Sequence, residues 1–118
     1  SSPPVVVVRL EAGKEPEAVR VSSEGAYVAA LLGEGSQPTF YGSADNGGET
    51  GVFLMGDARV TSGPPVPPCQ IPPGVRTDGA PLRGTLVMTK LRYFDDSTMP
   101  VAVDFTLDEY LGMAARGR

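Results

Sequence analysis

Six of the eleven residues from Gly63 to Pro73 are proline, and no other stretch of the chain restricts its fold as strongly. Proline fixes φ and lacks a backbone N–H, so this segment cannot be a helix or a central strand. We expect an extended, polyproline-like surface loop that continues to Pro81. The segment has the composition of a linker, but neither side of it is long enough for a stable domain. Residues 1–118 are therefore expected to form a single domain.

The first third of the chain alternates between strand and helix signals. Val5–Leu10 opens with four valines, and such an unbroken apolar run is typical of a strand buried on both faces. Glu17–Val21 alternates polar and apolar residues, which predicts a half-buried strand paired with the first in an antiparallel hairpin. A helix is expected over residues 24–32, with Gly33 ending it.

Four more strands are expected, at residues 38–41, 50–55, 84–94 and 101–105. The first two of these flank the glycine-rich turn Gly42–Gly48, in which Asn46-Gly47 is a strong hairpin signal. Thr106 and Glu109 have the spacing of a capping box, which predicts a closing helix over residues 107–115. The apolar face of this helix is expected to consist of Leu107, Tyr110 and Leu111, with no apolar stripe in its last turns. Together the elements predict an α+β fold, with an antiparallel or mixed sheet of about five strands, two helices on one face and a long Pro-rich loop.

The absence of histidine limits the chemistry that this chain can perform. Histidine is the usual base of nucleophilic triads and the commonest metal ligand. Ser-His-Asp and Cys-His catalysis and histidine-bearing zinc sites are therefore excluded. The single cysteine, Cys69, excludes an internal disulfide and an all-cysteine zinc site. We expect no cofactor, and a role other than catalysis is favoured.

Asp95, Asp96 and Asp104 form the best carboxylate cluster in the sequence. Carboxylate oxygens suit magnesium or calcium, and a magnesium-dependent hydrolase is the weakest of three functional hypotheses. The first two aspartates are favoured as ordinary turn residues that bond to their own backbone. We therefore expect no metal at these positions.

The charge distribution argues against nucleic acid as a partner. The net charge is −4, and residues 1–60, with four basic and eight acidic side chains, carry all of it. A nucleic-acid binder needs a basic patch, and the sequence shows none. The longest apolar run is far too short for a membrane span, and no secretory signal is visible. The chain begins with Ser1 rather than methionine, so secretion is left open.

Two binding hypotheses remain. The leading one is a non-enzymatic binding or structural module that acts through protein–protein contacts, including self-association. Its contact residues would be the prolines of the proline-rich segment, which can present a stiff ligand to an aromatic groove: Pro64, Pro65, Pro67, Pro68, Pro72 and Pro73. The alternative is a small-ligand or nucleotide-binding domain that uses the glycine-rich turn and nearby arginines. Its residues would be Arg59, Arg76, Arg83, Asn46 and Gly47.

The order of elements resembles a known family. Val5–Leu10 leads into Gly13-Lys14-Glu15-Pro16, then a strand and a helix that ends at Gly33. This opening is similar to that of small uncharacterised αβ domains encoded by phages, plasmids and large DNA viruses. Gly84–Val87 and Phe105–Glu109 are similar to later parts of that family, but its central Asn-Glu-Gly turn and Leu-Pro-x-Asn-Arg stretch are missing. The resemblance implies a virus- or phage-encoded accessory protein, cytoplasmic or virion-associated, and supplies no catalytic residue.

Overall fold

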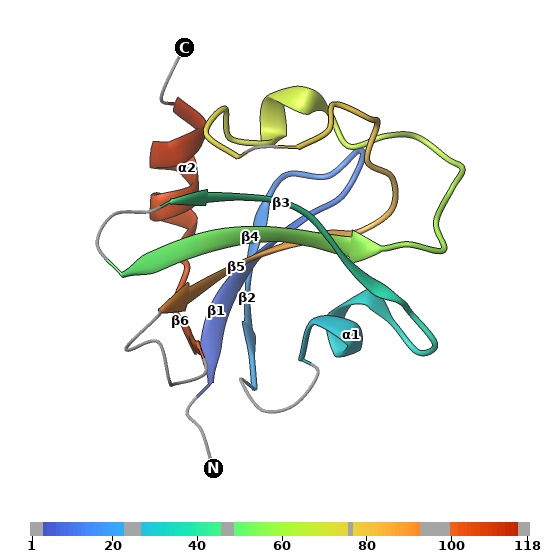
Figure 1. Cartoon of the computed structure of the whole chain (residues 1–118). Helices are drawn as coiled ribbons and strands as arrows, with labels where there is room; N and C mark the ends of the chain where they lie inside the picture. Colours follow the sequence, from blue (N-terminus) through green and yellow to red (C-terminus); the bar gives the residue numbers. More distant parts are fainter. Residues whose placement is uncertain (1–3, 23–26, 46–48, 76, 93–99, 116–118) are drawn as a thin grey trace.

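The computed structural model describes residues 4–22, 27–45, 49–75, 77–92 and 100–115 (Figure 1). Within these ranges the chain forms six strands, two α-helices and one short 3-10 helix. The strands are β1 (Val5–Leu10), β2 (Glu17–Val21), β3 (Pro38–Asp45), β4 (Thr50–Asp57), β5 (Leu86–Arg92) and β6 (Val101–Val103). The helices are α1 (Tyr27–Leu32), α2 (Leu107–Ala115) and the 3-10 helix η1 (Pro68–Gln70).

All the pairings in the sheet are antiparallel. The strand order is β2-β1-β5-β4-β3, and β6 pairs with the end of β5. The α+β prediction and the β1–β2 hairpin are confirmed, with six strands in place of about five. At the centre, Met88 of β5 lies between Val8 of β1 and Leu54 of β4. The sheet is therefore built around β5, which makes contacts with strands from both halves of the chain.

The β3–β4 hairpin is longer than the sequence predicts. Ser43 and Ala44 were expected in the turn, but they belong to β3 and pair with Phe53 and Val52 of β4. Apolar residues on the partner strand explain this, because they extend the ladder into the glycine-rich stretch. The expected turn residues 46–48 lie outside the described residues. A bulge at Tyr41 interrupts the pairing between Phe40 and Gly42.

The two helices cover opposite faces of the sheet, so the expectation that they share one face is wrong. Side chains alternate along each strand, and Val7 of β1 packs in the cluster beneath α1. The next residue, Val8, packs in the larger cluster beneath α2. Both valines are fully buried. A central strand with apolar side chains on both faces must have both faces buried. One helix therefore packs on each face of the sheet.

Helix α2 starts with the predicted capping box. The Thr106 hydroxyl accepts a hydrogen bond from the Glu109 N–H (3.1 Å), and Glu109 Oε1 accepts one from the Thr106 N–H (3.2 Å). The predicted apolar face is only partly correct, because Leu111 is 51% exposed. Met113 and Ala114 are buried instead, so the apolar stripe continues into the last turn at the spacing set by Tyr110.

The proline-rich segment is exposed over much of its length, but it is not uniformly extended, and two of its residues, Val66 and Pro72, are buried. Val66 and Leu82 are buried in the same cluster as the sheet residues, and Pro72 is also buried. The segment turns through η1, and the Tyr110 hydroxyl donates a hydrogen bond to the Gln70 carbonyl. The burial of Val66 could not be predicted from the sequence, because the apolar residues between the prolines follow no helix or strand period.

Candidate functional site

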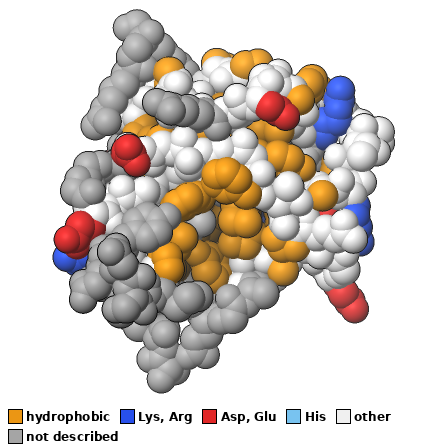
Figure 2. Space-filling view, viewed as in Figure 1, with side chains coloured by type: hydrophobic (Ala, Val, Ile, Leu, Met, Phe, Trp, Pro, Cys, Tyr) orange, Lys and Arg blue, Asp and Glu red, His pale blue; other side chains and the backbone are white. Residues whose placement is uncertain are grey.

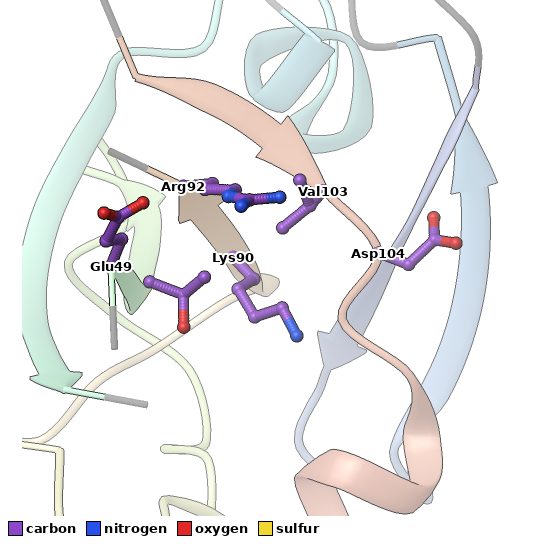
Figure 3. A pocket seen from close by; sticks show the side chains of 6 residues that line it. Glu49, Lys90, Arg92, Val103 and Asp104 are labelled. Carbon is purple, nitrogen blue, oxygen red and sulfur yellow. The ribbon is translucent and has the colours of Figure 1, made fainter. Parts of the chain in front are cut away.

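A polar cavity of about 590 Å³ opens beside the C-terminal end of β5 (Figure 3). Its lining comes from the start of β4, from β5 and from the end of β6: Glu49, Thr50, Lys90, Arg92, Val103 and Asp104. The cross-strand pairs Thr50–Arg92 and Val103–Lys90 place these residues on the α2 face of the sheet. We call this site the polar cavity.

Lys90 is held in place by α2. Its ammonium group lies 2.6 Å from Glu109 Oε2, and its side chain is only 15% exposed. The other oxygen of Glu109 is engaged in the capping box with Thr106. A chain of hydrogen bonds therefore runs from the start of α2 to the cavity, and it fixes one cation at the cavity wall.

The two acidic residues of the polar cavity point in different directions. Asp104 Oδ1 accepts a hydrogen bond from the Val6 N–H (2.9 Å), and its side chain points away from Lys90 and Arg92 in Figure 3. Glu49 lies on the opposite side of the cavity from Asp104. The acidic group available to a molecule in the cavity is therefore Glu49.

A second cavity, of about 370 Å³, lies within the proline-rich segment. Its walls are mainly apolar and include Val66, Ile71, Val75 and Leu82. Four of the six prolines predicted as partner contacts line it: Pro65, Pro68, Pro72 and Pro73. The other two are outside its lining, Pro64 exposed and Pro67 partly buried. The exposed Cys69 lies in η1.

Of the residues predicted for a small-ligand site, the structure describes only Arg59 and Arg83. Arg59 follows the C-terminal end of β4, whereas Asp45 and Glu49 lie at the other end of this strand. Eight residues of strand span about 27 Å, so Arg59 lies far from Asp45 and Glu49. Arg83 donates a hydrogen bond to the Gly63 carbonyl. Arg76, Asn46 and Gly47 lie outside the described residues.

Arg59 instead serves a buried carboxylate. Asp57 is 5% exposed, and its Oδ2 lies 2.9 Å from Arg59 Nη2. Asp57 Oδ1 also accepts hydrogen bonds from the backbone N–H groups of Arg59 (3.0 Å) and Gln37 (3.1 Å). The side-chain and backbone hydrogen bonds from Arg59, followed by that from Gln37, hold the pKa of Asp57 well below its usual range. Through its hydrogen bond from the Gln37 N–H, the Asp57 carboxylate joins the end of β4 to the connection between α1 and β3.

The predicted carboxylate cluster is described only at Asp104. Asp95 and Asp96 lie outside the described residues, and the Asp104 carboxylate bonds to the backbone of β1. Across the part of the chain that the structure describes, no three acidic or cysteine side chains are grouped to hold a metal ion. In the same ranges, no helix is long and apolar enough to cross a membrane.

Hydrophobic side chains gather on the α1 face, between α1, β2, β3 and β4 (Figure 2). Phe40 is 55% exposed, and its ring centroid lies 5.8 Å from that of Phe53. The other members are only partly buried, and the whole set is Val19, Val21, Leu31, Leu32, Phe40, Phe53 and Met55. We call this set the apolar patch.

Sequence reasoning missed Lys90 and Arg92 as candidate site residues. Two basic residues at i and i+2 in a predicted strand lie on one face of the sheet, and this spacing was the available signal. The partner strand could not be read from the sequence, so their approach to Glu49 could not be predicted. The glycine-rich turn was a useful pointer, because Glu49 and Thr50 follow it directly.

Comparisons with known proteins return no match to a family model, to a curated protein or to a solved structure. The family resemblance noted in the sequence accordingly stays a prediction, and the function is argued from the geometry of this chain.

Proposed function

We propose that the chain is a non-enzymatic binding module that docks a partner protein on the apolar patch. The observation that carries the proposal is the exposure of this patch, with Phe40 55% exposed and beside Phe53. Contiguous exposed apolar surface is a frequent mark of protein interaction sites. Aromatic residues are also enriched at such interfaces, where they fill pockets on the partner.

The charge of the surrounding chain favours a different protein as the partner over a second copy. Every residue of the apolar patch lies within residues 1–60, which carry the whole net charge of −4. Two copies facing each other would bring like charges together, whereas a partner with a neutral or basic rim would be attracted. An accessory role in a virus or phage, which the sequence resemblance implies, is compatible with such docking.

The test compares two exposed apolar residues on opposite faces. Phe40→Glu places a charge in the apolar patch, and Leu111→Glu places one on the exposed side of α2. A partner identified by affinity capture would be purified, and its Kd would be measured against the wild-type chain and both variants. We expect Phe40→Glu to weaken binding by about 2 kcal/mol or more, roughly thirtyfold, as for an aromatic hot spot. Leu111→Glu is expected to bind as wild type.

Equal binding by Phe40→Glu and the wild-type chain would contradict the proposal. A Kd that depends on Pro65→Ala or Pro73→Ala, and not on Phe40, would place the contact at the proline-rich segment as the sequence alone suggested. Thermal melts of all variants establish that each one folds, so a loss of binding reports on the surface.

A further inference from the structure

We propose that the partner adds an extended segment to the free edge of β3, as an additional strand of the sheet. The inference rests on the proposed docking at the apolar patch, and it specifies how the partner binds there. β3 pairs with β4 on one side, and no other described strand pairs with it. The unpaired edge of a strand is a row of backbone donors and acceptors, which an extended peptide can complete.

The hydrogen-bond pattern shows which backbone groups of β3 face this edge. The Ala58 N–H donates to the carbonyl of Gln37, which lies directly opposite (3.0 Å), so this pair is a bonded one. Bonded and non-bonded pairs alternate along antiparallel strands. Phe40, opposite Met55, is three pairs further on and is therefore in a non-bonded pair. Its N–H and C=O consequently point away from β4, toward the free edge.

The same pattern continues beyond the bulge. The bulge lies in β3, so the alternation along β4 is uninterrupted, and Gly51 and Phe53 direct their backbone groups toward β5. Ser43 lies opposite Phe53, and Asp45 lies opposite Gly51. The N–H and C=O groups of Ser43 and Asp45 therefore also face the free edge. They are two residues apart, which is the spacing that an antiparallel ladder requires.

The other outer strand, β2, is better protected against such pairing. Charged side chains on an edge strand hinder its pairing with another chain. β2 has Glu17 and Arg20 among its five residues, whereas β3 has no charged residue between Pro38 and Asp45. β3 is therefore the edge that is more open to an added strand.

The side chains of β3 define the segment that fits. Directly opposite residues in a sheet share a face, so segment residues opposite Phe40 and Ser43 would lie beside the apolar patch. Apolar side chains suit these two positions. Asp45 is exposed, and none of the described residues forms an ion pair with it. A Lys or Arg of the segment opposite Asp45 would add a favourable cross-strand charge pair.

A second copy of β3 does not supply this chemistry. Asp45 is the one charged residue of the strand, so two β3 edges side by side would offer no cation to either carboxylate. The occupant is therefore a segment of a different protein, with apolar residues at alternate positions and a basic residue at its start.

The experiment titrates the intact chain with labelled synthetic peptides that are blocked at both ends. The panel has the pattern Lys-Thr-X-Thr-X-Thr, where X is Val, Leu or Phe, and the lysine is designed to lie opposite Asp45. Fluorescence anisotropy measures the Kd. We expect saturable binding of at least one peptide. In that complex, amide hydrogen exchange should become slower at the N–H groups of Phe40 and Ser43.

Two changes to the backbone test whether the peptide pairs as a strand. Ser43→Pro removes the outward N–H and should weaken binding about tenfold, because a peptide carbonyl loses its donor. N-methylation of the peptide residue opposite Ser43 should weaken binding about tenfold as well, and it leaves the protein unaltered. Ala18→Pro is the matched control on β2 and should bind as wild type. Ala18 lies opposite Val8, and its N–H faces outward because alternate residues of β1, beginning with Val6, bond away from β2.

One change of charge tests the direction of the segment. Asp45→Lys should weaken binding of the lysine peptide by about two- to fivefold. The same variant should strengthen binding of the matching peptide that begins with Glu, by a similar factor. An unchanged order of the two peptides would contradict the placement of the basic residue opposite Asp45.

Three further outcomes would overturn strand addition. One is the absence of saturable binding across the panel by wild-type chain whose thermal melt shows that it is folded. Another is equal binding of the N-methylated peptide. The third is a dimer in light scattering that Ser43→Pro converts to a monomer, which would assign the edge to a second copy. The docking proposal is judged separately: if the purified partner binds Ser43→Pro as wild type and Phe40→Glu weakly, docking stands and strand addition does not.

Discussion

The two faces of the sheet are covered to different extents. On the α2 face, a nine-residue helix and the proline-rich segment cover the strands, and Leu54 and Met88 are fully buried. On the α1 face, a six-residue helix covers them, and Val28 is its one buried residue. The apolar patch around α1 is partly exposed.

The strands themselves do not cause this difference, because they are apolar on both sides. Val7 and Val8 are adjacent, identical and fully buried, yet they belong to different clusters. The connections between strands make the difference, since the long β4–β5 connection folds onto one face only. We infer that the α2 face supplies most of the stability, while the α1 face carries the partly exposed apolar patch.

The strongest test of this division is Phe105→Ala in the core beneath α2. Phe105 is fully buried, so its removal should lower the free energy of unfolding by about 3–5 kcal/mol. Denaturant unfolding measures the change. Leu111→Ala on the exposed side of α2 is the control and should change stability by less than about 0.5 kcal/mol. Similar values for the two variants would contradict the role assigned to this core.

A matched pair in β1 compares the faces directly. Val8→Ala should cost about 2 kcal/mol, because the closed α2 face cannot relax around the lost methyl groups. Val7→Ala should cost about 1 kcal/mol, because the short α1 can move toward the space. The same denaturant series measures both. If Val7→Ala cost as much stability as Val8→Ala, or more, the two faces would not differ in how tightly they are packed.

Tyr27 provides the polar link between α1 and the sheet. Its hydroxyl shares a hydrogen bond of 2.9 Å with that of Thr89, which is buried in β5. Tyr27→Phe should cost about 1 kcal/mol, because it leaves the Thr89 hydroxyl without this partner. A double-mutant cycle with Thr89→Val isolates the pair. Additive losses in the cycle would mean that the hydrogen bond does not hold α1.

The Asp57–Arg59 pair adds a smaller effect that depends on pH. The pKa of Asp57 is lowered in the folded chain, so the unfolded chain binds a proton first as the pH falls. Its contribution to stability is present above the ordinary Asp pKa of about 3.9 and is lost at lower pH. Asp57→Asn should therefore lower Tm at neutral pH and converge with wild type in acid. Thermal melts over this range test it, and parallel curves would be the contrary result.

The smallest change in stability is expected at the apolar patch. Phe40→Ser should alter the free energy of unfolding by less than about 0.5 kcal/mol, because the side chain is more than half exposed. Thermal and denaturant melts measure this change. A loss above about 1 kcal/mol would show that Phe40 belongs to the core and not to a free surface.

Local patterns in the sequence were sufficient for most elements of the fold. The four valines of β1, the alternation in β2 and the capping box at Thr106 all gave the correct element type. These signals depend on neighbours in sequence, which is why they could be read directly. The predicted apolar face of α2 was wrong at Leu111. Which side of a helix is buried depends on the elements that pack against it, and these could not be read from the sequence.

The sites were less accessible to sequence reasoning. Lys90 acquires its role from Glu109 on another element, and the exposure of Phe40 depends on which elements pack over β3. Neither relation has a local signature. The place where the proline-rich segment packs could not be predicted from the sequence either. Proline specifies the local backbone and not the surface that the segment packs against.

The pairing of β1 has a consequence for how the chain folds. Val6 bonds through its carbonyl to the Phe105 N–H and through its N–H to Asp104, across a separation of 98 residues for the latter pair. Closing so long a loop is slow, and folding on the millisecond-to-second scale of β-rich proteins is expected. During synthesis on a ribosome, β1 has only β2 to pair with until β5 emerges. The apolar faces of that early hairpin would then be exposed to chaperones, or to other nascent chains, while residues 22–85 are synthesised.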